Sequence, residues 1–196
     1  MESKEIILDA IRRAKVPSQP HPGSFASESV GDNERRFIDV VESVGGKAFS
    51  VRSMAEAETA IRNIPVLLGS ERICSCVAEL QLGVVQLEGV MDERELDSLD
   101  GAIVSGELAV AENGAVWVNP SALRFRSVLF LAAHLVLVVP RNGLVGTMNE
   151  AYERLDFRAH NTAYFISGPT KTADIEQNLV IGAQGPRTLH VFLVGE

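Results

Sequence analysis

Cysteine and histidine are scarce in this chain, which has two cysteines and four histidines among its 196 residues. Cys74 and Cys76 are too few for a disulfide framework or for an iron–sulfur cluster, which takes about four thiolates. The four histidines (His21, His134, His160, His190) give no Cys/His spacing typical of a zinc site. The chain also lacks a Walker loop and a G-x-G-x-x-G fingerprint. We therefore expect no metal, haem or flavin to be held by this chain alone.

Long apolar runs and an excess of basic residues are missing as well. The longest apolar run, Val128 to Pro140, is interrupted by His134 and is shorter than the roughly 20 residues that span a bilayer. The acidic N-terminus has no signal-peptide core, so we expect a cytoplasmic protein without membrane insertion. The net charge of -8 and the pI near 5.1 argue against nucleic-acid binding as the main activity.

The size and composition of the chain fit one globular domain with an N-terminal appendage. Hydrophobic residues make up 46% of the chain and charged residues 22%, which allows a full core. Ser3 is a good cap for a helix with Ile6, Ile7 and Ile11 on one face. Residues 17–31, rich in proline, serine and glycine, read as a linker. We therefore divide the chain into an N-terminal helix and linker, residues 1–31, and a main domain, residues 32–196. The helix either folds back on its own domain or packs on a partner.

The main domain opens with alternating helices and strands. Asp32 caps a helix that ends at Gly45-Gly46, and Lys47 to Val51 is a short strand. Ser53 caps a second helix, and Val66 to Leu68 reads as a buried strand. Alternation at this spacing predicts an α/β fold with a mostly parallel, Rossmann-like sheet flanked by helices.

The centre of the chain departs from this alternation. Two β-type runs, Leu108 to Ala111 and Ala115 to Val118, flank Glu112-Asn113-Gly114. Asn-Gly between apolar runs is a strong hairpin signal, because both residues accept a positive φ. We therefore predict a β-hairpin inserted in the α/β architecture, with Glu112 at the edge of its turn.

Two further elements follow the hairpin. The apolar run from Val128 to Val139 is split at His134 into a helical piece and a strand. Thr147 caps a helix that continues through Leu155, with Glu150 completing a capping box.

The C-terminal region carries the most specific motif. Tyr164 to Ile166 reads as a strand, and the decapeptide from Ser167 to Glu176 reads as a tight loop and the start of a helix that ends at Gly182. Leu189 to Val194 reads as the next strand. Together they predict a βαβ unit, whose loop after the first strand is where open α/β sheets place ligands.

This decapeptide resembles the signature of the LUD domain, the family of the lactate-utilisation protein C subunit. Two more blocks are similar to that family: Ala109 to Ala115, and His134 with the apolar strand after it. The resemblance covers most of the chain from about Asp32, so residues 32–196 are identified as a LUD-like domain. Asn113 stands where the family more often has threonine, and Ala133 where a proline is common.

The resemblance implies both a fold and a role. The fold would be similar to that of the sugar-phosphate isomerase and CoA-transferase group. The role would be that of a non-redox subunit in the oxidation of L-lactate to pyruvate, beside iron–sulfur partner subunits that hold the electron-transfer centres. This chain would bind a small anionic ligand, its partner subunits, or both.

The candidate ligand-binding residues lie in the predicted loop and hairpin. Backbone N–H groups at a helix start, together with the Lys171 ammonium, can hold an anion. An ordinary helix start capped by its own threonines is an equally good interpretation of the same residues. The candidate set is Gly168, Pro169, Thr170, Lys171 and Thr172, with Asn113 and Arg124 as further candidates.

Glu112 also has a catalytic interpretation. Class I CoA transferases have a catalytic glutamate in a Ser-Glu-Asn-Gly block, which Ala111-Glu112-Asn113-Gly114 resembles. A glutamate nucleophile there forms an acyl anhydride and then a CoA thioester. The chain lacks the glycine-rich oxyanion-hole sequence of that family. Glu112 is therefore the candidate catalytic residue of an alternative function, a stand-alone enzyme that handles acyl groups or CoA; its structural interpretation is that it accepts backbone hydrogen bonds at the turn.

Overall fold

The computed structural model describes residues 3–14, 31–80, 82–157, 162–175 and 178–195. Its α-helices are α1 (Ser3–Arg13), α2 (Asn33–Ser43), α3 (Met54–Arg62), α4 (Val128–Leu131) and α5 (Met148–Arg154). Its strands are β1 (Lys47–Val51), β2 (Ile73–Ser75), β3 (Gly101–Ser105), β4 (Leu108–Val110), β5 (Ala115–Val118), β6 (His134–Pro140), β7 (Leu144–Val145), β8 (Tyr164–Ile166), β9 (Lys171–Ile175), β10 (Asn178–Ile181) and β11 (Thr188–Val194). The predicted linker residues 17–30, His21, His160 and Glu176 lie outside the described residues.

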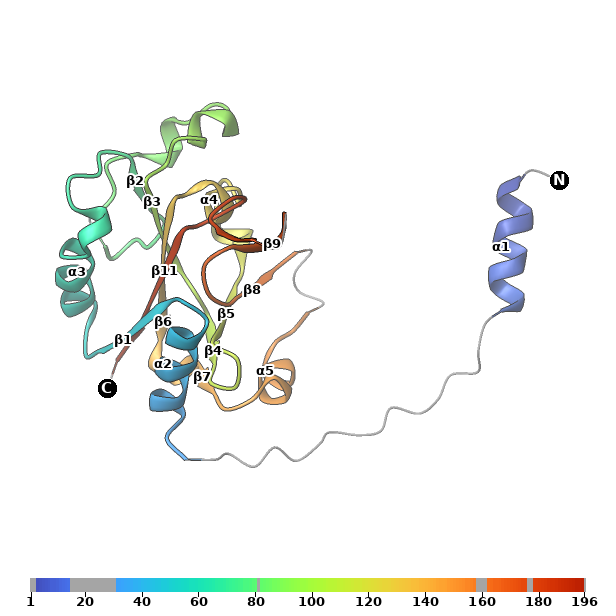
Figure 1. Ribbon diagram of the computed structural model, residues 1–196, viewed down its shortest axis with the longest axis horizontal. Helices are drawn as coiled ribbons and strands as arrows, with labels where there is room; N and C mark the ends of the chain where they lie inside the picture. The colour runs from blue at the N-terminus through green and yellow to red at the C-terminus, as the bar shows by residue number, and fades with distance from the viewer. Residues whose placement is uncertain (1–2, 15–30, 81, 158–161, 176–177, 196) are drawn as a thin grey trace.

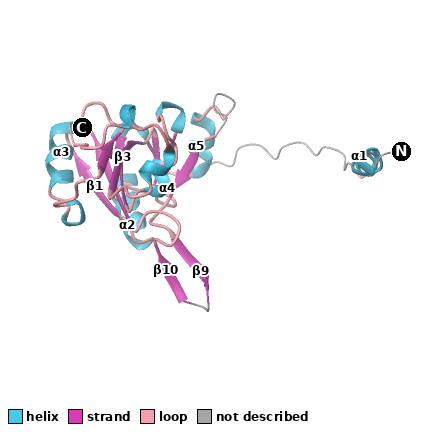
Figure 2. Ribbon diagram, turned by 90° about the horizontal axis from the view of Figure 1, so that it is seen from above, coloured by secondary structure: helices cyan, strands magenta, loops and turns pink. Residues whose placement is uncertain are grey.

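Three sheets organise the strands. The central sheet has five strands in the order β1-β11-β6-β3-β2, and each neighbouring pair is parallel (Figure 1). A second sheet has the order β7-β4-β5-β8, with antiparallel β4–β5 and β5–β8 pairs. The third is the antiparallel β9–β10 hairpin, which projects from the body of the molecule in Figure 2. This arrangement confirms the predicted α/β class with a mostly parallel central sheet flanked by helices.

The central sheet is buried on both faces. One face packs on α3, where Ile61 shares a core cluster with Phe192 of β11. The opposite face packs on α2 and the second sheet, where Phe37 and Val191 share another cluster. Successive residues of a strand point to opposite faces, which is why the neighbours Val191 and Phe192 lie in different clusters. The continuous apolar sequence of Leu135–Val139 in β6 reflects this double burial.

The chain passes from the central sheet to the second sheet at Gly106. The Gly106 N–H donates to the carbonyl of Val138 in β6, and Glu107 N–H donates to the carbonyl of Trp117 in β5. A Cβ atom at Gly106 would overlap the side chain of Val116, so the two sheets meet here at backbone distance. Glycine is required at this crossing because any side chain would push the sheets apart.

Most of the local predictions are confirmed, because their signals are short-range. The Asp32 carboxylate caps α2 by accepting from the N–H groups of Glu34 and Arg35 at 3.1 and 3.3 Å. The predicted strand Lys47–Val51 is β1, and Ser53 caps α3 through the Glu56 N–H. The run split at His134 becomes α4 and β6.

The predicted hairpin is confirmed, but it belongs to a different sheet from the one expected. β4 and β5 pair antiparallel, with Val110 opposite Ala115, across a turn of residues 111–114. The two strands do not interrupt the parallel sheet; they form the middle of the second sheet. The alternation of their side chains explains this, since Val116 packs toward the central sheet and Trp117 toward α5.

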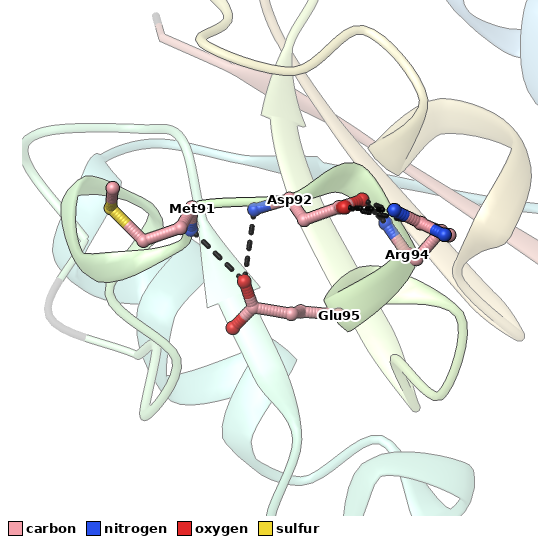
Figure 3. Close-up of polar contacts among 4 residues, drawn as sticks. All are labelled: Met91, Asp92, Arg94 and Glu95. Carbon is pink, nitrogen blue, oxygen red and sulfur yellow. Dashed lines mark hydrogen bonds and ion pairs between the residues drawn. The ribbon is translucent and has the colours of Figure 1, made fainter.

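The predicted strand at Val66–Leu68 is wrong. Residues Pro65–Leu67 form a 3-10 turn, and the edge strand of the sheet is Ile73–Ser75. Pro65 starts this turn because its fixed φ suits the first position of a helix. The connection from β2 to β3 continues through further 3-10 turns, one of which is stabilised by a capping box. There the Glu95 carboxylate accepts from the N–H groups of Met91 and Asp92, and Asp92 pairs with Arg94 (Figure 3).

The predicted βαβ unit is also wrong. The segment after β8 is the β9–β10 hairpin, not a helix, and β8 pairs with β5 in the second sheet rather than with β11. Two backbone hydrogen bonds close the base of the hairpin segment: Thr170 N–H donates to Pro186 O, and Gly182 N–H to Thr170 O. The acidic residues that suggested a helix start stand among β-branched Thr172, Ile175 and Val180, which favour strands.

His190 is a buried histidine in the middle of the central sheet. Its side chain is 5% exposed and stacks on Phe49, with the ring centroids 6.4 Å apart. Among the described residues, its Nδ1 has no hydrogen-bond partner. Burial lowers the pKa of His190 from 6.5 to about 4, and the nearby charges of Lys47 and His134 act in the same direction. His190 is therefore neutral in the folded protein at neutral pH.

Acid should therefore destabilise the fold through His190. In the unfolded chain His190 is protonated with the ordinary pKa of 6.5, whereas in the folded chain it is protonated only when the pH falls to about 4. Stability present above pH 6.5 is lost as the pH falls through this window. We expect the free energy of unfolding, measured by urea denaturation, to fall less steeply between pH 7 and 4.5 in His190→Gln than in the wild type. Equal slopes would contradict the assignment.

Candidate functional site

The β4–β5 turn brings together the candidate residues Glu112 and Asn113. The Asn113 Oδ1 accepts from the Ala115 N–H at 3.1 Å, and the Gly114 N–H donates to Val110 O at 3.0 Å. These bonds fix the turn, and Gly114 has the positive φ of 66° that the turn requires. Both Glu112 and Asn113 are exposed, so the turn presents a carboxylate and an amide on a rigid frame.

The Glu112 carboxylate contacts the N-terminus of α5. Its Oε2 accepts a hydrogen bond of 2.8 Å from the backbone N–H of Met148, the first residue of that helix. The first N–H groups of a helix have no partner within the helix, and the helix dipole favours a negative charge there. Glu112 thus stabilises α5 across 36 residues of sequence, which is a structural role that the sequence pattern does not reveal.

The segment from Ser167 to Lys171 lies against the same turn and the end of α2. Ser167 Oγ donates to Asn113 O at 2.8 Å. A Cβ atom at Gly168 would lie 2.8 Å from Val44 O, so this segment approaches the C-terminal end of α2 at backbone distance. The fold therefore brings Asn113 together with the 167–171 segment. Ser167 is the residue that sequence reasoning missed, although it opens the same motif.

The backbone of this segment does not offer the helix N-terminus on which the anion-binding prediction rested, because no helix starts there. The Thr170 N–H is bonded to Pro186 O, and Lys171 and Thr172 face Ile181 and Val180 in the β9–β10 pair. Pro169 is buried and has no N–H to donate. Any anion bound here would depend on side chains rather than on a row of helical N–H groups.

Lys171 lies at the carboxyl end of α2. Its Nζ is 3.6 Å from the position that a Cβ would take at Gly45, the residue after the helix cap. The carbonyl end of a helix carries partial negative charge and attracts a cation. The Lys171 side chain is exposed, so its ammonium remains accessible to a second anionic group from solution.

Arg124 belongs to a different part of the molecule. Its guanidinium donates to Glu88 O at 2.9 Å and Val90 O at 3.0 Å, and lies over the Phe125 ring at 5.3 Å. It lines a cavity of about 250 Å³ together with Cys76. These contacts hold the β2–β3 connection in place. Among the described residues, the hydrogen-bond partners of Arg124 differ from those of Glu112 and Asn113 and lie away from Lys171, so Arg124 does not join these residues in one site.

His134 stands at the start of β6 opposite Thr188, and its Nδ1 is 2.9 Å from Thr188 Oγ1. Burial lowers the pKa of His134, and the charge of Arg187 adds to this effect while Asp100 opposes it. Within the described ranges, no group of three or more His, Cys, Asp or Glu side chains is placed to hold a metal ion. In the same part of the chain, no helix is both long and apolar enough to cross a bilayer.

Comparison with known proteins identifies a family. The LUD domain matches residues 76–194, which include the β4–β5 turn and the 167–171 segment. Proteins named lactate utilization protein C from Shouchella clausii and Halalkalibacterium halodurans are 34% identical over 92 residues and 31% identical over 105 residues. These matches cover 44% and 50% of this chain, and 40% and 46% of the two relatives, so the chain spans less than half of their length.

Two longer matches come from Deinococcus radiodurans. A lactate utilization protein C from this organism is 28% identical over 212 residues, covering 99% of this chain and 96% of the relative. The crystal structure of a DUF162 family protein from the same organism superposes with a TM-score of 0.64 at 22% identity, covering 83% of this chain and 96% of that one. The structural likeness establishes a shared fold.

The contact of Glu112 with α5 predicts different effects for two substitutions. Glu112→Ala removes the acceptor of the Met148 N–H, and we expect it to lower the free energy of unfolding by about 1 kcal/mol. Glu112→Gln keeps an oxygen acceptor and loses only the charge, so its cost should be smaller, within about 0.5 kcal/mol. Urea denaturation at neutral pH measures both values. Equal losses in the two variants would show that the charge, and not the hydrogen bond, is what stabilises α5.

The close approach of Gly168 to α2 gives a matched pair of glycine substitutions. Gly168 and Gly69 have similar positive φ values of 70° and 78°, but a Cβ has nothing within 4 Å at Gly69. Gly69→Ala should therefore cost only the backbone strain of about 1 kcal/mol. Gly168→Ala adds the clash with Val44 O, and its thermal midpoint should fall clearly below that of Gly69→Ala. Equal midpoints would mean that the 167–171 segment does not pack tightly on α2.

Proposed function

The chain belongs to the LUD domain family, and on this premise we propose that it takes part in L-lactate utilisation as a non-redox subunit of a lactate-oxidising system. The observation that carries the proposal is the match to the Deinococcus radiodurans lactate utilization protein C, which runs over 99% of this chain and 96% of that relative. A match of this extent includes the N-terminal helix as well as the domain. The cytoplasm is the proposed location.

The proposed partners are iron–sulfur subunits. Oxidation of lactate to pyruvate releases two electrons and two protons, and the electrons need an acceptor. Iron–sulfur clusters take about four thiolates, whereas this chain has two cysteines, of which Cys74 is buried in the core. The clusters would therefore belong to other subunits, and this chain would contribute binding and positioning.

The proposed ligand is a small anion at the contact between the β4–β5 turn and the 167–171 segment. Asn113 supplies an exposed amide there, and Lys171 an exposed ammonium at the end of the neighbouring segment. A carboxylate such as that of lactate or pyruvate satisfies both groups. Gly168, Pro169, Thr170 and Thr172 would shape this site through the backbone, whereas Arg124 is set apart by its contacts with the β2–β3 connection.

The alternative function is a stand-alone enzyme that transfers acyl groups or CoA through Glu112. The Glu-Asn-Gly turn and the exposure of Glu112 favour it. The hydrogen bond from the Met148 N–H to Oε2 argues against this alternative. It engages one of the two carboxylate oxygens and lowers the nucleophilicity of the carboxylate. Formation of a CoA thioester by the isolated wild-type chain, and its absence in Glu112→Gln, would favour this alternative over the lactate-system proposal.

Growth on L-lactate tests the main proposal. A bacterial strain that lacks its own lactate utilization protein C should grow on L-lactate when it expresses this chain together with its genomic neighbours. Lys171→Gln should reduce that growth several-fold at equal protein levels, whereas the same change at exposed Lys47 should leave it unchanged. Growth on glucose controls for general fitness.

Affinity purification from the same strain tests the partners. We expect subunits that contain iron and reduce a dye in the presence of L-lactate to co-purify with this chain. Wild-type growth on lactate without the chain, or a purified chain with no iron-containing companion, would contradict the proposal.

A further inference from the structure

Helix α1 has an apolar face that is covered by nothing in the described structure. None of its residues is buried, and Ile6, Ile7 and Ile11 are 54%, 59% and 61% exposed. Figure 1 shows α1 apart from the rest of the chain. A helix of 11 residues is marginal in water by itself, because few hydrogen bonds offset the cost of nucleation. Its amphipathic pattern therefore requires a surface to pack on.

Two exposed aromatic side chains lie together on and just after α5. Tyr152 and Phe157 are 56% and 40% exposed, and their rings stack with centroids 4.9 Å apart. Phe157 in turn packs edge-on against Trp117 of the second sheet, at 5.3 Å. Phe157 thus contacts the core of the second sheet, while Tyr152 and Phe157 remain partly exposed to solvent. We call Tyr152 and Phe157, with the charged residues Glu153, Arg154 and Asp156 between them, the α5 patch.

The charges of the two surfaces are complementary. Helix α1 carries the basic residues Lys4, Arg12 and Arg13 against the acidic residues Glu5 and Asp9, and Arg13 forms an ion pair with Asp9 within the helix, so basic residues exceed acidic ones by one. The α5 patch carries two exposed acidic residues and the exposed Arg154, so acidic residues exceed basic ones by one, and the chain as a whole has a net charge of -8. An apolar contact bordered by opposite charges has defined orientation as well as affinity.

The connection between the two surfaces is short enough for α1 to reach the patch in its own chain. The N-terminus of α2 lies beside α5, because a Cβ at Gly146 would be 3.4 Å from Asn33 Nδ2 and 3.2 Å from Glu150 Oε1. Residues 14–31 connect α1 to this point, and a chain of that length spans up to about 60 Å when extended. Tethering on this scale gives an effective concentration on the order of millimolar, so a weak contact suffices.

We propose that α1 docks with its Ile6–Ile7–Ile11 face on the α5 patch of its own chain. The occupant of the patch is thus the N-terminal helix, placed in cis, with its basic side chains beside Glu153 and Asp156. This contact gives the N-terminal segment an ordered position over the second sheet. It is independent of the proposed role in lactate utilisation.

Paired cysteines in the full-length chain test the contact. Ala10 lies on the apolar face of α1, and exposed Asn149 lies three residues before Tyr152 on α5, hence on the same side of that helix. The test pair is Ala10→Cys with Asn149→Cys, equilibrated in a glutathione redox buffer. The matched control is Leu8→Cys with Asn149→Cys, because Leu8 is rotated from Ala10 by about 200° around the helix. Peptide mapping by mass spectrometry separates the introduced disulfide from any that involves Cys74 or Cys76.

Docking in cis predicts that the Ala10 pair forms its disulfide with an effective concentration at least about tenfold above that of the Leu8 pair, in a monomeric product. Equal values for the two pairs would overturn the proposal, because an undocked tether does not distinguish the faces of α1. A covalent dimer would overturn it too, since α1 would then occupy the patch of a second copy.

Two further substitutions in the Ala10 pair test the patch itself. Tyr152→Ser removes apolar contact area and should lower the effective concentration several-fold. Glu153→Lys reverses one charge and should lower it by a factor of about two, the scale of an exposed ion pair. If neither change has an effect while the Ala10 pair still forms preferentially, α1 docks elsewhere and the proposed patch is wrong.

Discussion

Strand β11 holds the central sheet together, and the rest of the structure depends on its pairing. It is parallel to β1 on one side over five residues and to β6 on the other over seven. The first strand of the domain and the strands from the middle of the chain are therefore joined only through the C-terminal strand in this sheet. Leu189, Val191 and Phe192 are almost fully buried, because both faces of β11 are covered. Interior parallel strands of this kind cannot form until the segments far apart in sequence have met.

The position of β11 also fixes the segment that precedes it. The hairpin of β9 and β10 must leave and re-enter the body near the start of β11, and the bonds of Thr170 to Pro186 and Gly182 close its base. As a result the 167–171 segment is pressed against the end of α2, which β1 holds in place beside β11. The meeting of Asn113, Ser167 and Lys171 with α2 is thus a consequence of how the sheet is assembled.

The LUD match covers residues 76–194 and so leaves out α2, α3, β1 and β2, although β1 and β2 complete the sheet and the end of α2 borders the candidate site. Lys171 lies at the end of α2, and Gly168 touches Val44 there. The residues of the family motif therefore owe their positions to elements outside the matched region. Helix α5 likewise depends on a distant residue, because the Glu112 carboxylate stabilises it from a turn 36 residues away in sequence.

The sequence by itself determined the features that rest on short-range physics. The caps at Asp32, Ser53 and Thr147, the turn at Glu112-Asn113-Gly114 and the α/β class follow from neighbouring residues and from periodicity. The family resemblance singled out the blocks that contain Asn113 and Ser167, and the structure shows the contact between them. The sequence misjudged the segment from Lys171 to Ile181, since acidic residues after Gly-Pro suit a helix start as well as a strand.

Only the tertiary structure decided between these conformations, because the hydrogen bonds that close the β9–β10 base come from Pro186 and Thr170 and not from the segment's own turn. It likewise decided which sheet each strand joins. β8 pairs with β5, and the chain leaves the parallel sheet at Gly106, so that β4 and β5 join the second sheet. Strand partners are chosen by which apolar faces can be buried together, and that depends on residues from the whole chain rather than on any local pattern.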